Sequence, residues 1–122
     1  MAPNRTSQQK DGDYGETAAA AHLALHGYRC LAANVHSRYG EIDIIAQGER
    51  YLLFVEVKTR RAGAKIPARE AVDPRKQRRI AATAEAWLAE HPTKLQPRFD
   101  VICVELAPGG ACTAIEWLEN AF

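Results

Sequence analysis

Apolar positions recur at the spacing of an α-helix in two stretches and form short β-rich runs in five others. The second helical stretch is the clearer of the two, because Ile80, Ala84 and Trp87 would share one face. The β-rich runs are bounded by turn residues, which is typical of strands. The pattern predicts helices over residues 13–26 and 74–91 and strands over residues 28–34, 39–46, 51–59, 99–106 and 113–118.

Residues suited to helix ends support both helices. Asp13 and Glu16 have the spacing of a capping box, and Gly27 suits the left-handed position that follows a helix. Asp73 followed by Pro74 is a favourable N-terminus, because the aspartate can cap the first turn and proline needs no hydrogen bond there.

The predicted order of elements is α-β-β-β-α-β-β, and 122 residues are enough for one domain. A mixed central sheet of about five strands flanked by helices is the simplest way to bury these apolar faces, which makes the expected class α/β. Residues 1–12 have little apolar surface and predict a flexible tail, so we expect the domain over residues 13–122. Residues 60–72 contain glycine and proline without a clear period and predict a loop.

Charge is nearly balanced over the whole chain but not along it. Sixteen Lys and Arg against 15 Asp and Glu give a net charge of +1. Residues 58–79 hold nine of the basic residues and only two acids, so this segment carries +7 and the remainder −6. Such a segment is a candidate for contact with phosphate groups, although a solvated helix face also explains part of it.

Several function classes lack support in the sequence. The longest apolar runs are far shorter than the ~20 residues of a membrane span, and the first twelve residues do not resemble a secretion signal. Three cysteines with no CxxC spacing predict neither a disulfide framework nor a zinc ribbon, so we expect a cytoplasmic protein. No phosphate-binding P-loop, dinucleotide fingerprint or esterase motif is present.

Charged residues interrupt an otherwise apolar predicted strand. Glu56 and Lys58 are two residues apart and therefore project from the same face. If residues 47–50 form a loop of even length, Asp43 lies opposite Phe54 and shares that face. A loop of odd length would place Asp43 on the other face.

Two interpretations of this charged face remain open. An exposed sheet face is normally polar, and ordinary pairing across strands would explain an acid and a lysine there. The other interpretation is a cluster of carboxylates that needs protons or a hard divalent cation to neutralise it. The hairpin register alone does not distinguish Asp43 from Glu41 as a member of such a cluster.

Motifs spread along the chain resemble the YraN family, small bacterial proteins similar to archaeal Holliday-junction resolvases. Asp43 followed, after twelve residues, by Glu56-Val57-Lys58 resembles the PD-(D/E)XK signature of restriction-endonuclease-like nucleases, with Ile42 in place of the proline. The wider resemblance covers about residues 13–122. It rests on the segments Gly15-Glu16, Gly27-Tyr28, Gly40-Glu41-Ile42-Asp43, Phe54-Val55-Glu56-Val57-Lys58-Thr59-Arg60, Lys76-Gln77-Arg78, Arg98-Phe99-Asp100-Val101 and Asn120-Ala121-Phe122.

The resemblance implies a resolvase-like fold and a metal-dependent nuclease site. Asp43, Glu56 and the backbone carbonyl of Val57 would hold Mg²⁺ or Mn²⁺, and Lys58 would be the catalytic lysine. Glu16 would lean toward the same site, although its role in a capping box is an equally good interpretation.

The resulting hypothesis is an endonuclease that hydrolyses phosphodiester bonds in branched or otherwise structured DNA and that could act as a homodimer. The alternative is a non-catalytic nucleic-acid-binding module that retains the nuclease fold, and a third hypothesis is a protein-interaction scaffold. The residues expected to contact nucleic acid are Arg60, Arg61, Lys65, Arg69, Arg75, Lys76, Gln77, Arg78 and Arg79.

Overall fold

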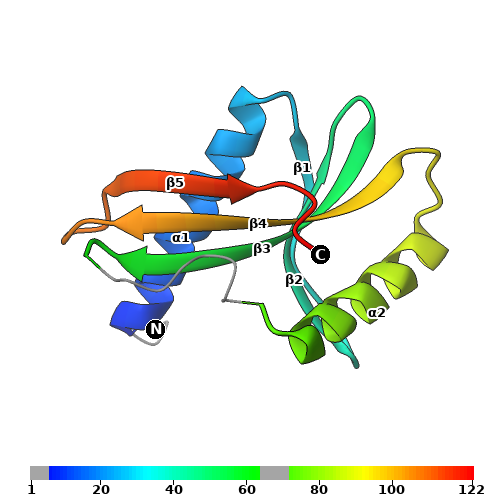
Figure 1. Cartoon of the computed structure of the whole chain (residues 1–122), viewed down its shortest axis with the longest axis horizontal. Coiled ribbons are helices and arrows are strands. Elements are labelled where there is room, and N and C mark those ends of the chain that lie inside the picture. Colours follow the sequence, from blue (N-terminus) through cyan, green and yellow to red (C-terminus); the bar gives the residue numbers. More distant parts are fainter. Residues whose placement is uncertain (1–5, 64–71) are drawn as a thin grey trace, which may run out of the picture.

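A computed structural model, which describes residues 6–63 and 72–122, has the expected order of two helices and five strands (Figure 1). The elements are α1 (Ser7–Leu25), β1 (Arg29–Ser37), β2 (Gly40–Gln47), β3 (Tyr51–Arg61), α2 (Pro74–Glu90), β4 (Gln96–Leu106) and β5 (Cys112–Leu118). These strands form one mixed sheet in the order β1-β2-β3-β4-β5, in which β3 and β4 are parallel and the other neighbours are antiparallel. The predicted α/β class is therefore confirmed.

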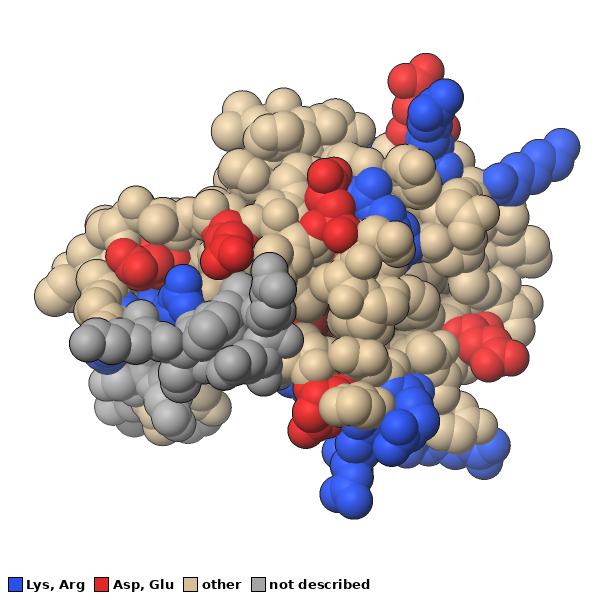
Figure 2. Space-filling model, in the orientation of Figure 1, with Lys and Arg blue, Asp and Glu red and all other residues tan. Residues whose placement is uncertain are grey.

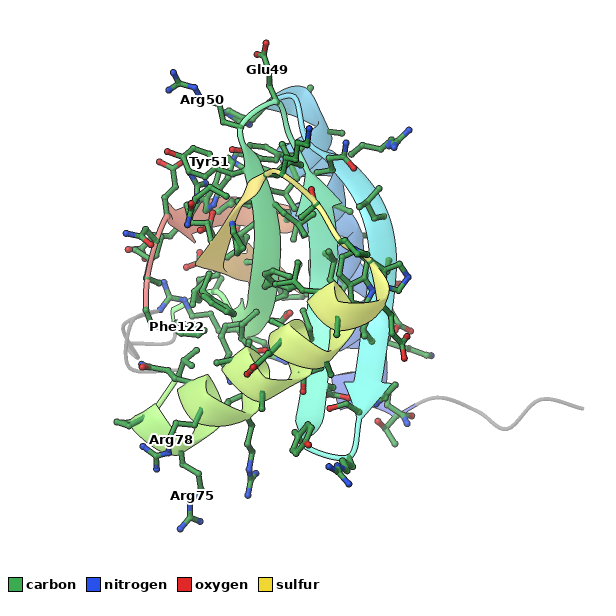
Figure 3. All side chains as sticks on the ribbon, turned by 90° about the vertical axis from the view of Figure 1, so that its right-hand side faces the viewer. Glu49, Arg50, Tyr51, Arg75, Arg78 and Phe122 are labelled. Carbon is green, nitrogen blue, oxygen red and sulfur yellow. The ribbon has the colours of Figure 1, made fainter. Side chains whose placement is uncertain are left out.

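The sheet separates two hydrophobic cores, each closed by one helix. On one face α1 contributes Ala19 and Leu23, and on the other α2 contributes Ile80 and Ala84. Figure 3 shows the same three layers, with α2 in front of the sheet and α1 behind it. Because α2 connects the parallel strands β3 and β4, it crosses one face of the sheet and lies beside the strands that carry the charged residues.

Helix boundaries differ from the sequence expectation at the first helix and agree at the second. α1 begins at Ser7, six residues before Asp13, and Thr6 and Gln9 form the capping box that was expected from Asp13 and Glu16. Residues 7–12 therefore belong to the helix and not to a tail. The cause is that Thr6 and Gln9 offer the same reciprocal hydrogen bonds about two turns earlier. Asp73 caps α2 as expected, by accepting a hydrogen bond from the Lys76 amide.

Four of the five strands are longer than predicted, and the expected loop over residues 60–72 is wrong at its start. Arg60 and Arg61 continue β3, because they pair with the end of β4. Residues 64–71 of that loop lie outside the described part of the chain.

The β2–β3 hairpin has a tighter turn than the loop over residues 47–50 that was expected. The Gly48 amide donates to the Tyr51 carbonyl at 2.9 Å, so only two residues lie in the turn. Phe54 consequently pairs with Ile45 and not with Asp43, a shift of two residues. The predicted pairing of Asp43 with Phe54 is therefore wrong. A shift of two residues does not by itself move Asp43 to the other face of the sheet, so the reason for expecting it on the face of Glu56 still holds.

Gly15 lets α1 approach the sheet directly over β3. A Cβ atom at this position would overlap Thr59 Oγ1 and lie 3.1 Å from Thr59 Cβ. The helix therefore presents a glycine, an alanine and a leucine at four-residue spacing to the sheet, which explains why its apolar stripe is weak in the sequence.

Substituting Gly15 by alanine is expected to destabilise the protein although alanine is the better helix former. Overpacking against Thr59 costs more than the gain in helix propensity, so we expect a net loss of about 1–3 kcal/mol in the free energy of unfolding. Gly12→Ala in the same helix is the matched control, because its Cβ would meet nothing within 4 Å. Urea unfolding should show Gly12→Ala as stable as the parent or more stable, and an equal effect of both substitutions would contradict the packing argument.

Candidate active site

The two carboxylates of the motif meet where β2 and β3 separate. The last pair between these strands is Ile44 with Val55, so Asp43 and Glu56 are the next residues on either side. Asp43 Oδ2 accepts a hydrogen bond from the Val57 amide at 2.8 Å, which ties the β2 side chain to the backbone of β3. The two cores place Ile42 on the α2 face and Ile44 on the α1 face, so the alternation of β2 is interrupted beside Asp43.

Glu56 is a buried carboxylate that is neutralised by two lysines. The residue is 5% exposed, and its Oε1 forms an ion pair with Lys76 of α2 and lies 3.7 Å from Lys58 Nζ. A buried charge is tolerated only when it is paired, so these lysines are part of the reason that Glu56 can be carried on this strand.

The protonation equilibrium of Asp43 reflects the crowding of acids. Burial, followed by the negative charge of Glu56, raises the pKa of Asp43 from 3.8 to about 7, and the hydrogen bond from Val57 opposes the rise. Burial and the neighbouring carboxylate both penalise the charged form of Asp43, which favours binding of a proton or an external cation there.

Glu16 of α1 is near enough to Asp43 for its charge to act on that carboxyl group, but it does not join Asp43 and Glu56 as a third candidate ligand. Burial raises its pKa, a hydrogen bond from Asn34 Nδ2 at 3.3 Å opposes the rise, and its negative charge acts on Asp43. Thr6 and Gln9 form the capping box of α1, so Glu16 has no part in the helix cap. Of the two interpretations of Glu16, the structure favours the one near the acid pair. Asn34, held at a positive φ of 51°, is a partner that the sequence did not indicate.

The structure separates Asp43 from Glu41, which the hairpin register alone left as alternatives and between which the family resemblance favoured Asp43. Glu41 is exposed and pairs with His36 Nδ1 at 3.2 Å, on the strand pair β1–β2. Asp43 is half-buried and bonded to β3, so it is the residue that joins Glu56.

The surroundings of Lys58 lower the pKa of its ammonium group. Burial lowers its pKa, as do the hydrogen bond to Lys76 and the positive charge of Lys76, while Glu56 opposes this effect. For Lys76 burial is the largest single effect and lowers the pKa, but the hydrogen bond to Glu56, the contact with Lys58 and the negative charges of Glu56 and Asp43 together outweigh it, so the pKa is raised. Lys76 was expected only among the nucleic-acid contacts, and its position in the acid site is new.

The remaining basic residues divide between two places. Arg75, Lys76 and Arg79 of α2 line a cavity of about 380 Å³ together with Gly40 and Glu41 at the start of β2. Figure 2 shows blue side chains gathered along the lower edge of the molecule, below the start of α2, and Figure 3 shows Arg75 and Arg78 pointing away from the helix into solvent.

A second group lies at the end of β3. Arg60 and Arg61 line a cavity of about 440 Å³ beside the first half of α1, where Arg61 pairs with Asp11 at 3.2 Å. Gln77 donates its side-chain amide to the Val72 carbonyl at 3.1 Å. Lys65 and Arg69 lie outside the described residues.

The donor set suits a hard cation with few protein ligands. Among residues 6–63 and 72–122, no three His, Cys, Asp or Glu side chains come together as a group that could hold a metal. Mg²⁺ is commonly bound by one or two carboxylates, with water and substrate phosphate completing its shell, so Asp43 and Glu56 fit it without a third acidic side chain.

The sequence model described as "Uncharacterised protein family UPF0102" matches residues 15–104. The chain belongs to the UPF0102 family. This is the YraN family, so the family membership expected from the motifs is confirmed. The UPF0102 segment contains Glu16, Asp43, Glu56, Lys58 and Lys76.

Relatives within UPF0102 match nearly the whole chain. A UPF0102 protein of Dichelobacter nodosus is 41% identical over 121 residues, which cover 98% of this chain and 94% of that protein. One of Pelobacter propionicus is 45% identical over 121 residues (97% and 86%), and one of Symbiobacterium thermophilum is 47% identical over 112 residues (91% and 94%). Within the described part of this UPF0102 protein, neither helix has both the length and the apolar character needed to cross a membrane.

The raised pKa of Asp43 predicts how stability depends on pH when divalent cations are removed. Between about pH 4 and pH 7 the folded state binds more protons at this carboxyl group than the unfolded state does. The contribution of Asp43 to the free energy of unfolding is therefore fully present below the pKa that this group has in the unfolded chain. It decreases as the pH rises to about 7 and then levels off, with a total loss of about 2–4 kcal/mol.

Asp43→Asn isolates this contribution, because asparagine keeps an acceptor for the Val57 amide and cannot ionise. The free energy of unfolding of Asp43→Asn, minus that of the parent, should rise between about pH 4 and pH 7. Both values are measured by urea unfolding with a chelator present. A constant difference between about pH 4 and pH 8 would contradict the assignment of the titration to Asp43.

Proposed function

We propose that this protein is a metal-dependent endonuclease that hydrolyses phosphodiester bonds in DNA, with branched or structured DNA as the preferred substrate. The observation that carries the proposal is the convergence of Asp43, Glu56 and Lys58 at one point between β2 and β3. Asp43, on the neighbouring strand β2, is the first acid of the PD-(D/E)XK motif. Glu56 is its second acid and Lys58 its lysine.

Each side chain has a role that follows from its chemistry. Asp43 and Glu56 would hold Mg²⁺ or Mn²⁺, with the Val57 carbonyl as a backbone ligand, and the cation would polarise the scissile phosphate and lower the pKa of a water. Lys58, with its lowered pKa, would orient the attacking water or neutralise the charge that develops on the phosphate. Glu16 would bind the cation through water or restrict the position of Asn34.

The basic residues supply the affinity for the phosphate backbone. Arg75, Lys76 and Arg79 line one cavity, and Lys76 is ion-paired with Glu56, so a strand bound there would lie beside the carboxylates. Cleavage of two strands of a junction needs two active sites, so we propose that two copies of the chain act together as a homodimer.

A non-catalytic DNA-binding module is the second candidate. The observation that favours it is the ion pair of Lys76 with Glu56, which neutralises a carboxylate that a nuclease needs for its cation. The two candidates agree on DNA binding and differ on cleavage.

A cleavage screen separates these candidates. The purified protein is incubated with four-way junctions, flaps, nicked duplex and single strands of DNA in Mg²⁺, in Mn²⁺ and in chelator. We expect cleavage of at least one branched substrate with either cation and none with chelator. Binding that weakens steeply with salt, without cleavage of any substrate, would establish the binding module instead.

A further inference from the structure

We propose that Lys76 is a built-in counter-ion of the acid pair, which holds Glu56 when no divalent cation is present and leaves it when a cation binds. The inference deepens the proposed function and rests on its cation site. In this proposal Lys76 controls the affinity of the site for the cation, in addition to any contact that it makes with DNA.

The position of Lys76 is fixed by the start of α2. Its amide donates to the cap residue Asp73 at 2.8 Å, and Thr83 of the same helix bonds Ser37 in β1 at 2.8 Å. The helix is thereby attached to the sheet at the side where Glu56 lies, and the Lys76 ammonium is closer to Glu56 Oε1 than the Lys58 ammonium is.

A cation at Glu56 would compete with this ammonium group. Two positive groups, Lys58 and Lys76, already share one oxygen of a carboxylate that is 5% exposed. A divalent cation on the same oxygen would add a third positive group at short range, where repulsion is poorly screened. One ammonium group must move away, and Lys76 has the more exposed side chain, at 40% against 31% for Lys58.

The cavity beside Lys76 can receive the released side chain. Three basic residues (Arg75, Lys76 and Arg79) and two acids (Glu41 and Asp73) line it, so its lining carries a small net positive charge in the free protein. A phosphate group in this cavity would attract the ammonium away from Glu56 and so make room for the cation. Since coupling between two sites is reciprocal, cation binding and phosphate binding should strengthen one another through Lys76.

The test is a calorimetric titration of Mn²⁺ into the full chain without DNA. Lys76→Met should bind Mn²⁺ about 5- to 20-fold more tightly than the parent, because the competing charge is gone. Its melting temperature in chelator should fall, since Glu56 loses its nearest partner, and Mn²⁺ should raise it by more than in the parent. Lys76→Gln, which can keep a hydrogen bond to Glu56, gives the same comparison if the methionine variant folds poorly.

Arg78→Met is the matched control for the general effect of removing a positive charge. It lies on the same helix, it is exposed, and it does not line the cavity. Its Mn²⁺ affinity should change less than about twofold, as expected for a screened surface charge.

The coupling is tested with inorganic phosphate, which should tighten Mn²⁺ binding in the parent and not in Lys76→Met. Equal Mn²⁺ affinity of the parent and Lys76→Met would overturn the counter-ion role while leaving the cation site intact. Equal gains in Lys76→Met and Arg78→Met would also overturn it, in favour of general electrostatics. Absence of Mn²⁺ binding in every variant would overturn both this inference and the proposed cation site.

Discussion

Asp43→Asn and Glu56→Gln are each expected to reduce cleavage by at least about 10³-fold, on whichever branched DNA the parent protein cuts fastest. Each substitution keeps the size of the side chain and removes the charge that would hold the cation. The amide oxygen introduced by Asp43→Asn can still accept the hydrogen bond from Val57, so the end of β2 should stay in place.

DNA binding should survive these substitutions. Arg75 and Arg79 of α2 line the cavity beside the acid pair and are unchanged in both variants, so the dissociation constant for a junction, measured without divalent cation, should stay within a few-fold of the parent. Glu49→Gln is the matched control, because Glu49 is exposed at the turn of the same hairpin, at the opposite end of the molecule from Arg75 (Figure 3). Cleavage that persists in both Asp43→Asn and Glu56→Gln would locate the activity elsewhere or in a contaminant.

Asp100→Asn should cause the largest loss of stability among conservative substitutions in the described chain. Asp100 is 0% exposed and accepts two hydrogen bonds from Arg98 at 2.8 and 2.9 Å, one from Trp117 Nε1 at 2.8 Å and one from the Asn120 amide at 2.9 Å. Its hydrogen bonds raise the pKa of Arg98 above the usual value, so Arg98 stays charged. Asparagine would leave this charge poorly paired and would turn an amide NH₂ toward donors, at a cost of about 3–5 kcal/mol.

Glu119→Gln provides the comparison on the same arginine. Glu119 lies 3.2 Å from Arg98 Nη2 but its side chain is 61% exposed, so its removal should cost less than about 1 kcal/mol. Urea unfolding monitored by Trp117 and Trp87 fluorescence gives both values, provided that the denaturant slope is unchanged. A loss below about 1 kcal/mol for Asp100→Asn would mean that the network adapts to a neutral partner.

The Asp100 network also explains why the end of the chain belongs to the fold. Trp117 and Asn120 attach β5 and the residues after it to β4. The Ala121 amide then donates to the Phe99 carbonyl at 2.7 Å, and the Phe122 ring stacks on Phe99 with centroids 5.2 Å apart. From the sequence, Asp100 was noted only as part of a family motif. Its donors Trp117 and Asn120 are 17 and 20 residues away, so the residues around Asp100 do not indicate that these donors converge on it together with Arg98.

The order of elements, the α/β class and the start of α2 could be predicted from the sequence, because each depends on neighbouring residues. The caps at Asp73 and Pro74 act within one turn, and alternation of apolar residues places Glu56 and Lys58 on one face whatever the rest of the chain does. The start of α1 was predicted wrongly, because Asp13 and Glu16 have the spacing of a capping box while the cap that forms is Thr6 with Gln9.

Only the tertiary structure decided which charged groups meet. The hairpin turn shifted the register by two residues and brought Asp43 beside Glu56, and the packing of α2 across the sheet brought Lys76 to the same carboxylate from twenty residues away. Such contacts depend on how whole elements dock, to which many distant residues contribute. Alternation and helix capping are decided within a few residues, and for that reason the sequence determined the elements of this protein. The family resemblance indicated Asp43, Glu56 and Lys58, whereas the contacts of Lys76 with Glu56 and of Asn34 with Glu16 depend on the folded chain.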